Sequence, residues 1–159
     1  MATFEVFFYC LNEAILIDIF KVFDIGGSMV IHTFGAFFGL SVAFFYQPKD
    51  AIADKNGMGK GNYLSNLVSM SGTMFLFCFW PSFNGALGDG ASMHRAIINT
   101  YLAITSSVIA SIIVSRITHS GLLEMEIILN ASLAGGVAVG SSADIIVMPF
   151  GAMLAGFVT

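Results

Sequence analysis

The sequence predicts an all-α integral membrane protein, a polytopic helical bundle with about six transmembrane helices. Three observations lead to this fold class. The 159 residues are 57% hydrophobic and only 10% charged, whereas a soluble domain carries roughly 25% charged residues. The mean hydropathy is high, at +0.87. Short polar breaks divide the chain into apolar segments, most of them near the length of about 17–25 residues that crosses a bilayer as a helix.

The first two apolar segments differ in their polar content. The first covers about residues 4–20 and includes Asn12 and Glu13, so at least one of its faces must meet protein rather than lipid. The second covers residues 28–46 and is almost entirely apolar. The polar stretch 48–62 that follows is predicted to be the one long loop.

Four further segments complete the expected bundle. The third is expected to stop before Trp80 and Pro81, because proline lacks a backbone N–H and breaks a helix. The sixth reaches the last residue without a polar tail, so we expect the chain to be part of a longer protein. These four segments cover about residues 64–79, 94–117, 124–141 and 145–159.

The basic residues predict the orientation in the membrane. If the segments alternate in direction, the loops after the second and fourth segments share one side of the membrane. These loops hold most of the basic residues, namely Lys49, Lys55, Lys60 and Arg116. The opposite side holds Lys21 and Arg95. Because Lys and Arg are enriched in cytoplasmic loops, we expect the loop 48–62 to be cytoplasmic.

Polar residues recur around the start of the second segment. Asp24, Ser28 and His32 stand four residues apart, which would place them on one face of an α-helix. Gly35 and Gly39 continue this face as a small-xxx-small pair, where another helix could approach closely. Polar groups are costly in lipid, so such residues face the interior of a bundle or a pathway. This stripe is the first candidate for a functional site.

Several of these features also have a purely structural interpretation. A helix histidine is usually structural, but its position in mid-bilayer favours a functional His32. Asp24 could act only as a helix N-cap that accepts hydrogen bonds from backbone amides. Gly135 and Gly136 indicate helix packing rather than a phosphate loop, because no lysine follows them.

Other classes of function are disfavoured. The sequence carries no catalytic triad, metal-ligand cluster or nucleotide-binding loop, so we predict that the protein is not an enzyme and binds no metal or cofactor. It carries no basic run that would suggest nucleic acid. A membrane haem protein with two histidine ligands would need a second mid-membrane histidine, and these segments contain none.

Four blocks of the sequence follow one another in a recognisable order. The first, at residues 24–40, reads DIGGSMVIHTFGAFFGL. The others lie at residues 80–84 (WPSFN), 94–101 (HRA followed by NTY) and 130–140 (NASLAGGVAVG). Together they resemble the Rhesus (Rh) glycoproteins of the ammonium transporter superfamily, and the first block resembles the fifth-helix motif. The resemblance covers nearly the whole chain and places it in roughly the middle third of such a protein.

The resemblance implies a fold, an activity and an assembly. It implies an ammonium-transporter-like helical bundle in the plasma membrane and a homotrimer or Rh-type heterotrimer. Each subunit would have one narrow apolar pore for facilitated diffusion of ammonia or ammonium, with carbon dioxide as a further candidate. The alternative is a non-conducting Rh-like subunit that serves in assembly.

The resemblance also assigns roles to residues. His32 matches the first of two pore histidines, and Asp24 matches a buried acid that supports the outer recruitment site. Phe83 matches one of two stacked phenylalanines at the outer mouth, with simple packing as the alternative. Glu124 falls where the family often has an acid in the inner vestibule. Ser28 and Asn84 are secondary candidates. The second histidine and the partner of Phe83 are expected outside these residues.

Overall fold

The computed structural model describes residues 1–46, 61–118 and 125–159, which form helices and contain no strand. Six α-helices and two π-helices make up this part of the chain, so the predicted all-α bundle is confirmed. Most of the predicted loop 48–62, and Glu124, lie outside the described residues. The elements are α1 (Ala2–Glu13), η1 (Ala14–Ile19), η2 (Ser28–Thr33), α2 (Phe34–Tyr46), α3 (Tyr63–Asn84), α4 (Gly90–Thr118), α5 (Met125–Gly140) and α6 (Pro149–Val158).

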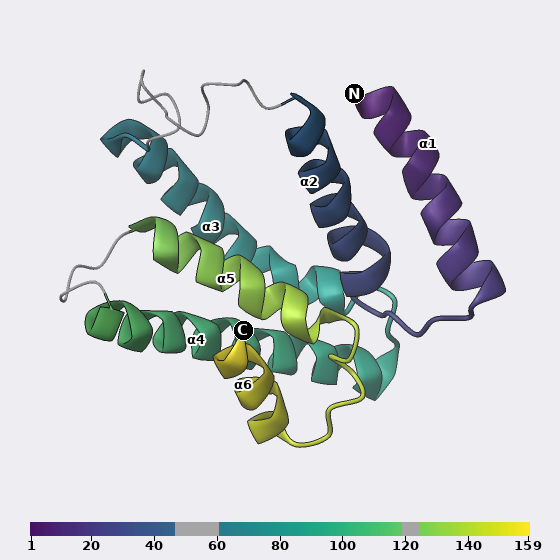
Figure 1. Cartoon of the computed structure of the whole chain (residues 1–159). Coiled ribbons are helices and arrows are strands. Elements are labelled where there is room, and N and C mark those ends of the chain that lie inside the picture. The colour runs from purple at the N-terminus through teal and green to yellow at the C-terminus, as the bar shows by residue number, and fades with distance from the viewer. Residues whose placement is uncertain (47–60, 119–124) are drawn as a thin grey trace.

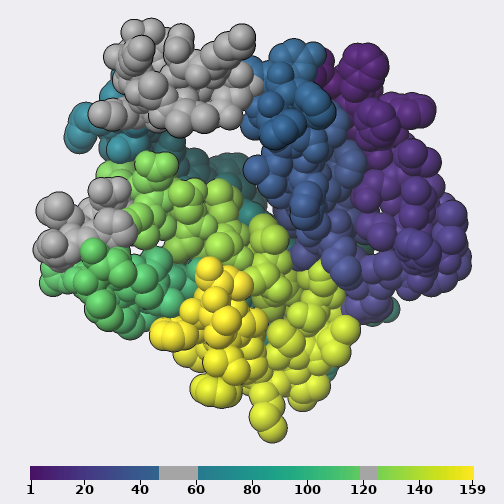
Figure 2. Space-filling model, in the orientation of Figure 1, coloured from purple at the N-terminus to yellow at the C-terminus, as the bar shows by residue number. Residues whose placement is uncertain are grey.

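The helices form two groups (Figure 1). Helices α1 and α2 lie against each other and make the smaller group, which occupies one edge of the molecule in Figure 2. The larger group is centred on α4, which contacts α3, α5 and α6. The π-helix η2 contacts α5. The start of the second segment therefore joins the two groups.

Small residues allow the larger group to pack closely. A Cβ atom added to Gly135 of α5 would lie 2.8 Å from the carbonyl oxygen of Ala103 in α4. The same carbonyl is also approached by Gly156 of α6. Such close contact between backbones is typical of helix packing in membranes. The buried apolar core around this contact consists of Ile25, Ala96, Ala103, Val139, Ala143 and Ala152.

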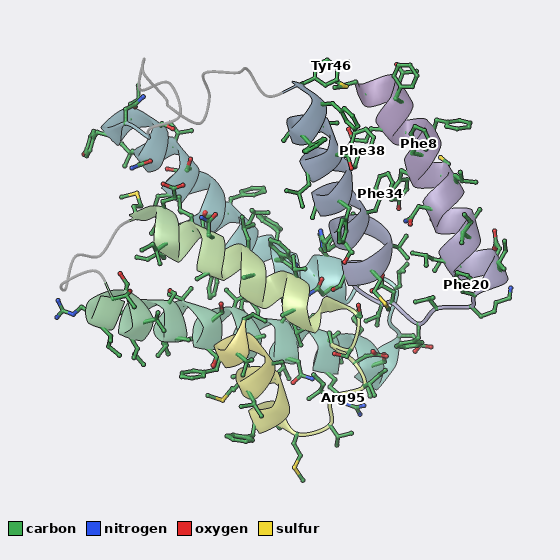
Figure 3. The ribbon with its side chains drawn as sticks, viewed as in Figure 1. Phe8, Phe20, Phe34, Phe38, Tyr46 and Arg95 are labelled. Atoms are coloured by element: carbon green, nitrogen blue, oxygen red, sulfur yellow. The ribbon has the colours of Figure 1, made fainter. Side chains whose placement is uncertain are left out.

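Large apolar side chains cover the outside of the molecule. Phe20 and Tyr46, at the two ends of the smaller group, are 67% and 74% exposed (Figure 3). Contiguous apolar surface of this kind indicates contact with lipid or with other protein. Within the described residues, the helices Ser28–Tyr46 and Gly90–Thr118 are long and apolar enough to cross a membrane.

The third helix ends later than the sequence indicates. Helix α3 does not stop at residue 79 but continues through Pro81 to Asn84. Trp80, Pro81 and Asn84 are all buried, and the Asn84 side chain is hydrogen-bonded to two other helices. We infer that these tertiary contacts offset the backbone hydrogen bond that Pro81 cannot donate.

The last helix begins later than predicted, at Pro149 rather than near residue 145. Proline suits the first turn of a helix, where its missing N–H costs nothing. Side chains of α4 hold the preceding connection in a non-helical path. Asn99 donates from Nδ2 to the carbonyl oxygens of Ala143 and Ile146, at 2.7 and 2.8 Å. Arg95, labelled in Figure 3, donates from Nη1 to the carbonyl oxygen of Asp144 at 2.9 Å.

Candidate functional site

The polar residues of the second segment do not share one α-helical face, so this prediction is wrong. Asp24 precedes the helix, and Gly27 adopts a left-handed conformation with φ of 70°, which no α-helix running from Asp24 could contain. From Ser28 to Thr33 the chain is a π-helix, whose hydrogen bonds span five residues instead of four. The four-residue spacing therefore does not describe this stretch.

Asp24 is a backbone acceptor for the start of η2. Its Oδ2 accepts hydrogen bonds from the amides of Met29 and Val30, at 2.9 and 2.8 Å. The first amides of a helix have no partner within the helix, and the carboxylate supplies one. Its other oxygen, Oδ1, is buried without a hydrogen-bond partner in the described chain. The geometry favours the capping interpretation of Asp24.

Ser28 links η2 to the end of α5. Its hydroxyl donates to the carbonyl oxygen of Val137 at 2.5 Å and accepts from the amide of Ser141 at 3.0 Å. The residue is only 8% exposed. Ser28 is therefore part of the packing between the two groups of helices rather than of a solvent-lined wall.

Asn84 links three helices at the end of α3. It is fully buried, and its Nδ2 donates to Oγ1 of Thr100 in α4 and to the carbonyl oxygen of Gly136 in α5, both at 3.1 Å. A Cβ atom on Gly26 would lie 2.5 Å from Oδ1 of Asn84. This asparagine holds the end of α3 next to the turn that precedes η2.

His32 lies among aromatic rings. Its ring centroid is 5.6 Å from that of Trp80 and 5.9 Å from that of Phe83. Its Nε2 is buried and has no hydrogen-bond partner among the described residues. A neutral imidazole can donate from one nitrogen and accept at the other, so this nitrogen has an unused hydrogen-bonding capacity in the described chain.

His32 lines a pocket of about 540 Å³ between the two groups of helices. The described wall is largely apolar and includes only a few polar groups. Asp24, Ser28, Phe83 and Asn84 are not part of it, and Gly35 is. The wall consists of Glu5, Val6, Tyr9, Ile31, His32, Phe34, Gly35, Trp80, Leu133 and Val137.

Three residues of this neighbourhood were missed from the sequence. Trp80 stands three residues before Phe83, so both face one way if the helix continues through Pro81. The expected helix end at residue 79 concealed this relation. Glu5 and Tyr9 are four residues apart in α1 and share its pocket-facing side. Their four-residue spacing in the sequence could have indicated that the two side chains lie on one face of the first helix.

The four glycines assigned to helix packing fall into two pairs. A Cβ atom on Gly136 would lie 2.8 Å from the ring of Trp80, and Gly135 is equally close to α4. At Gly35 and Gly39 an added Cβ would meet no described atom within 4 Å. The positions that a Cβ atom would occupy on the second pair are therefore open within the described chain.

The sequence relationships agree with this architecture. The Ammonium Transporter Family matches residues 4–159. Ammonium transporter Rh type C of Homo sapiens is 46% identical over 160 residues, which are 99% of this chain and 33% of that protein. The Xenopus laevis protein of the same name is 45% identical over 161 residues, with 34% of its length covered. The chain thus spans about a third of the length of these curated relatives.

A solved structure has the same fold. This structure, "Nitrosomonas europaea Rh50 and mechanism of conduction by Rhesus protein family of channels", aligns with a TM-score of 0.84 and 36% identity, over 94% of this chain and 40% of that one. These names describe transporters and a channel, in agreement with the prediction that the protein is not an enzyme, and the resemblance to Rh glycoproteins is confirmed. The chain belongs to the ammonium transporter family and is part of an integral membrane protein.

Proposed function

We propose that the protein is an Rh-type membrane channel through which ammonia or ammonium crosses by facilitated diffusion. The observation that carries the proposal is the environment of His32. Its Nε2 lacks a partner in the described chain, and its ring lies on the wall of a largely apolar pocket beside Trp80. The names of the relatives, which concern ammonium transport and conduction by channels, support the same function.

The physical chemistry of the pocket favours the neutral molecule. Moving a bare ammonium ion into a medium of low dielectric constant costs tens of kcal/mol by Born estimates, whereas neutral ammonia costs far less. Ammonia both donates and accepts hydrogen bonds, as a neutral imidazole does. A lysine or arginine at position 32 could not accept, and its fixed charge would repel the cation. We assign His32 the role of a relay along an apolar path.

Phe83 and Asp24 would act before this step. The ring of Phe83 is 46% exposed and adjoins His32, so it can offer its face to a cation before deprotonation. The Asp24 carboxylate would hold the start of η2 in place through the amides of Met29 and Val30. Glu124 remains a candidate acid of the inner vestibule.

We further propose an assembly and an orientation. The subunits would form a homotrimer or an Rh-type heterotrimer in the plasma membrane, with the loop 48–62 in the cytoplasm, and carbon dioxide is a second candidate gas. The exposed apolar surface of α1 and α2 supports contact with further protein or lipid. The concentration of basic residues in the loop 48–62 supports its cytoplasmic placement.

The test is ammonia flux into vesicles that contain the full-length protein. An internal pH dye reports ammonia entry, because each molecule that enters takes up a proton. We expect faster entry than into protein-free vesicles, without ATP. His32→Ala should change the flux, or its selectivity over methylamine, about five- to tenfold, which corresponds to one hydrogen bond to the passing molecule. Ser41→Ala is the matched control, since among the described residues Ser41 bonds through its side chain to the carbonyl oxygen of Phe37, within α2.

Two results would contradict the proposal. Equal entry into vesicles with and without the protein would overturn the channel function and favour a non-conducting subunit that serves in assembly. Unchanged flux and selectivity in His32→Ala would instead remove His32 from the pathway and leave the channel in place.

A further inference from the structure

The end of α5 is completed by a side chain from another part of the chain. In a continuing α-helix, the amide of Ser141 would bond directly to the carbonyl oxygen of Val137, four residues earlier. Instead, the Ser28 hydroxyl lies between these two groups, donating to Val137 at 2.5 Å and accepting from Ser141 at 3.0 Å. One serine thus takes the place of one helical hydrogen bond.

The neighbouring backbone holds this serine closely. The amide of Gly26 donates to the carbonyl oxygen of Gly140 at 3.0 Å, so the chain just before Ser28 is also attached to the end of α5. Any Cβ atom on Gly140 would collide with the Ser28 oxygen. The position of the hydroxyl is therefore fixed from both sides.

The same turn of α5 also holds the end of α3. The carbonyl oxygen of Gly136 accepts from Asn84, the residue directly after Phe83. Ser28 is bonded to the next carbonyl, that of Val137, and begins the π-helix that carries His32. The rings of His32 and Phe83 are thus attached to adjacent residues of one helix end.

We propose that Ser28 is a positioning residue that fixes His32 relative to Trp80 and Phe83 by closing the end of α5. This inference rests on the proposed channel function for its effect on transport, but its geometric part stands apart from conduction. Without the hydroxyl, Ser141 and Val137 can bond directly, so α5 extends and η2 loses its own hydrogen bonds to α5, while the bond from Gly26 to Gly140 remains. Selectivity would then change because the His32 ring shifts along the pocket wall.

The experiment uses the full-length protein and measures the position of residue 32 directly. His32→Cys is made with and without Ser28→Ala, and the rate at which iodoacetamide alkylates residue 32 is read by mass spectrometry of the peptide. We expect Ser28→Ala to change this rate about fivefold, as expected for one lost hydrogen bond. The control, Ser41→Ala, should leave the rate unchanged. An unchanged rate in Ser28→Ala would overturn the inference.

A transport measurement follows in the variants that retain His32. Misplacement of His32 should change the ratio of methylamine to ammonia entry in Ser28→Ala about fivefold, whereas a mere loss of folded protein lowers both rates together. A ratio equal to that of the wild type would contradict a positioning role in transport. If the wild-type protein carries no ammonia, the proposed function fails, and the alkylation rate alone decides the inference.

A second variant keeps the test decisive if Ser28→Ala folds poorly. Gly140→Ala keeps Ser28 but forces its hydroxyl away from the end of α5, because the new Cβ atom would collide with the hydroxyl oxygen. We expect Gly140→Ala, made together with His32→Cys, to change the alkylation rate of residue 32 about fivefold, as Ser28→Ala does. An alkylation rate unchanged by Gly140→Ala would overturn the inference.

Discussion

The two halves of the second segment differ more than their hydropathy indicates. In the first half, taken together with the turn before it as residues 24–33, Ile25, Gly26 and Ser28 are buried, and polar contacts reach α5. In the second half, helix α2, no residue is buried. Hydropathy therefore places both halves in the membrane, but it does not reveal which of them packs against the larger group of helices.

The two halves are held by different interactions. The first depends on hydrogen bonds and on glycines without space for a side chain. The second meets α1 through the ring of Phe34, whose centroid is 5.8 Å from that of Tyr9. Within α2 itself, Phe34 is stacked on Phe38 with the ring centroids 5.8 Å apart, and both residues are labelled in Figure 3. His32 lies at the end of the firmly attached half. The comparison indicates that the site is placed by the polar half and that the aromatic half is available to further helices or lipid.

The largest effect is expected from Gly26→Ala. The new Cβ atom would lie 2.5 Å from Oδ1 of Asn84 and 2.8 Å from the carbonyl oxygen of Gly140. We expect the free energy of unfolding to fall by about 3 kcal/mol, at the upper end for overpacking. The measurement is a lower melting temperature of the full-length protein in detergent. Gly35→Ala, with no described atom within 4 Å, should cost less than about 1 kcal/mol. An equal loss in Gly35→Ala would show that a segment outside this chain packs there.

An intermediate effect is expected from Asp24. Asp24→Ala removes the acceptor of two amides. It should lower the free energy of unfolding by about 2–3 kcal/mol, as for hydrogen bonds to a charged group. Asp24→Asn keeps an acceptor oxygen and should cost about 1 kcal/mol. Melting temperature and ammonia flux are measured on both variants. If Asp24→Asn melts near the wild type but loses as much flux as Asp24→Ala, the charge acts on the substrate and the purely supporting role is wrong.

The smallest effect is expected in the aromatic half. Phe34→Leu removes the ring contacts with Tyr9 and Phe38 but keeps an apolar side chain of similar length. The free energy of unfolding should fall by about 1 kcal/mol, which is the interaction energy of an aromatic pair. The measurement is again thermal melting. A loss as large as that in Gly26→Ala would remove the distinction between the halves.

The sequence was sufficient for the approximate extent of the helices in the described chain, because short polar breaks separate its apolar segments. Three helix ends lie four or five residues from their expected positions, namely the end of α3 and the starts of α4 and α6. The first and the last of these differences have the same physical reason. Asn84 holds the turn after Pro81 in the helix, and Asn99 holds the connection before Pro149 out of one. Both asparagines act through partners 16 to 52 residues away. Local propensity contains no information about such partners.

The site was predictable only in part. The resemblance pointed to His32 and Phe83, which lie next to each other in the structure. Asp24 does not share a helical face with His32, because the left-handed Gly27 interrupts the helix and a π-helix follows. Since π-helices are rare and depend on context, residue spacing gave no indication of one. Trp80 was missed because its helix was expected to end too early.

The attachment of Ser28 to α5 has a consequence for biosynthesis. The serine and its partners, Val137 and Ser141, are 109 and 113 residues apart, so the ribosome finishes the early segment long before its partners exist. During that interval the Gly26 amide and the Ser28 hydroxyl lack the bonds they make to the end of α5 in the folded protein, and unsatisfied polar groups in lipid cost several kcal/mol. The early segment must therefore wait near water or within the insertion machinery. Its final placement in the bilayer comes only after α5 has been made.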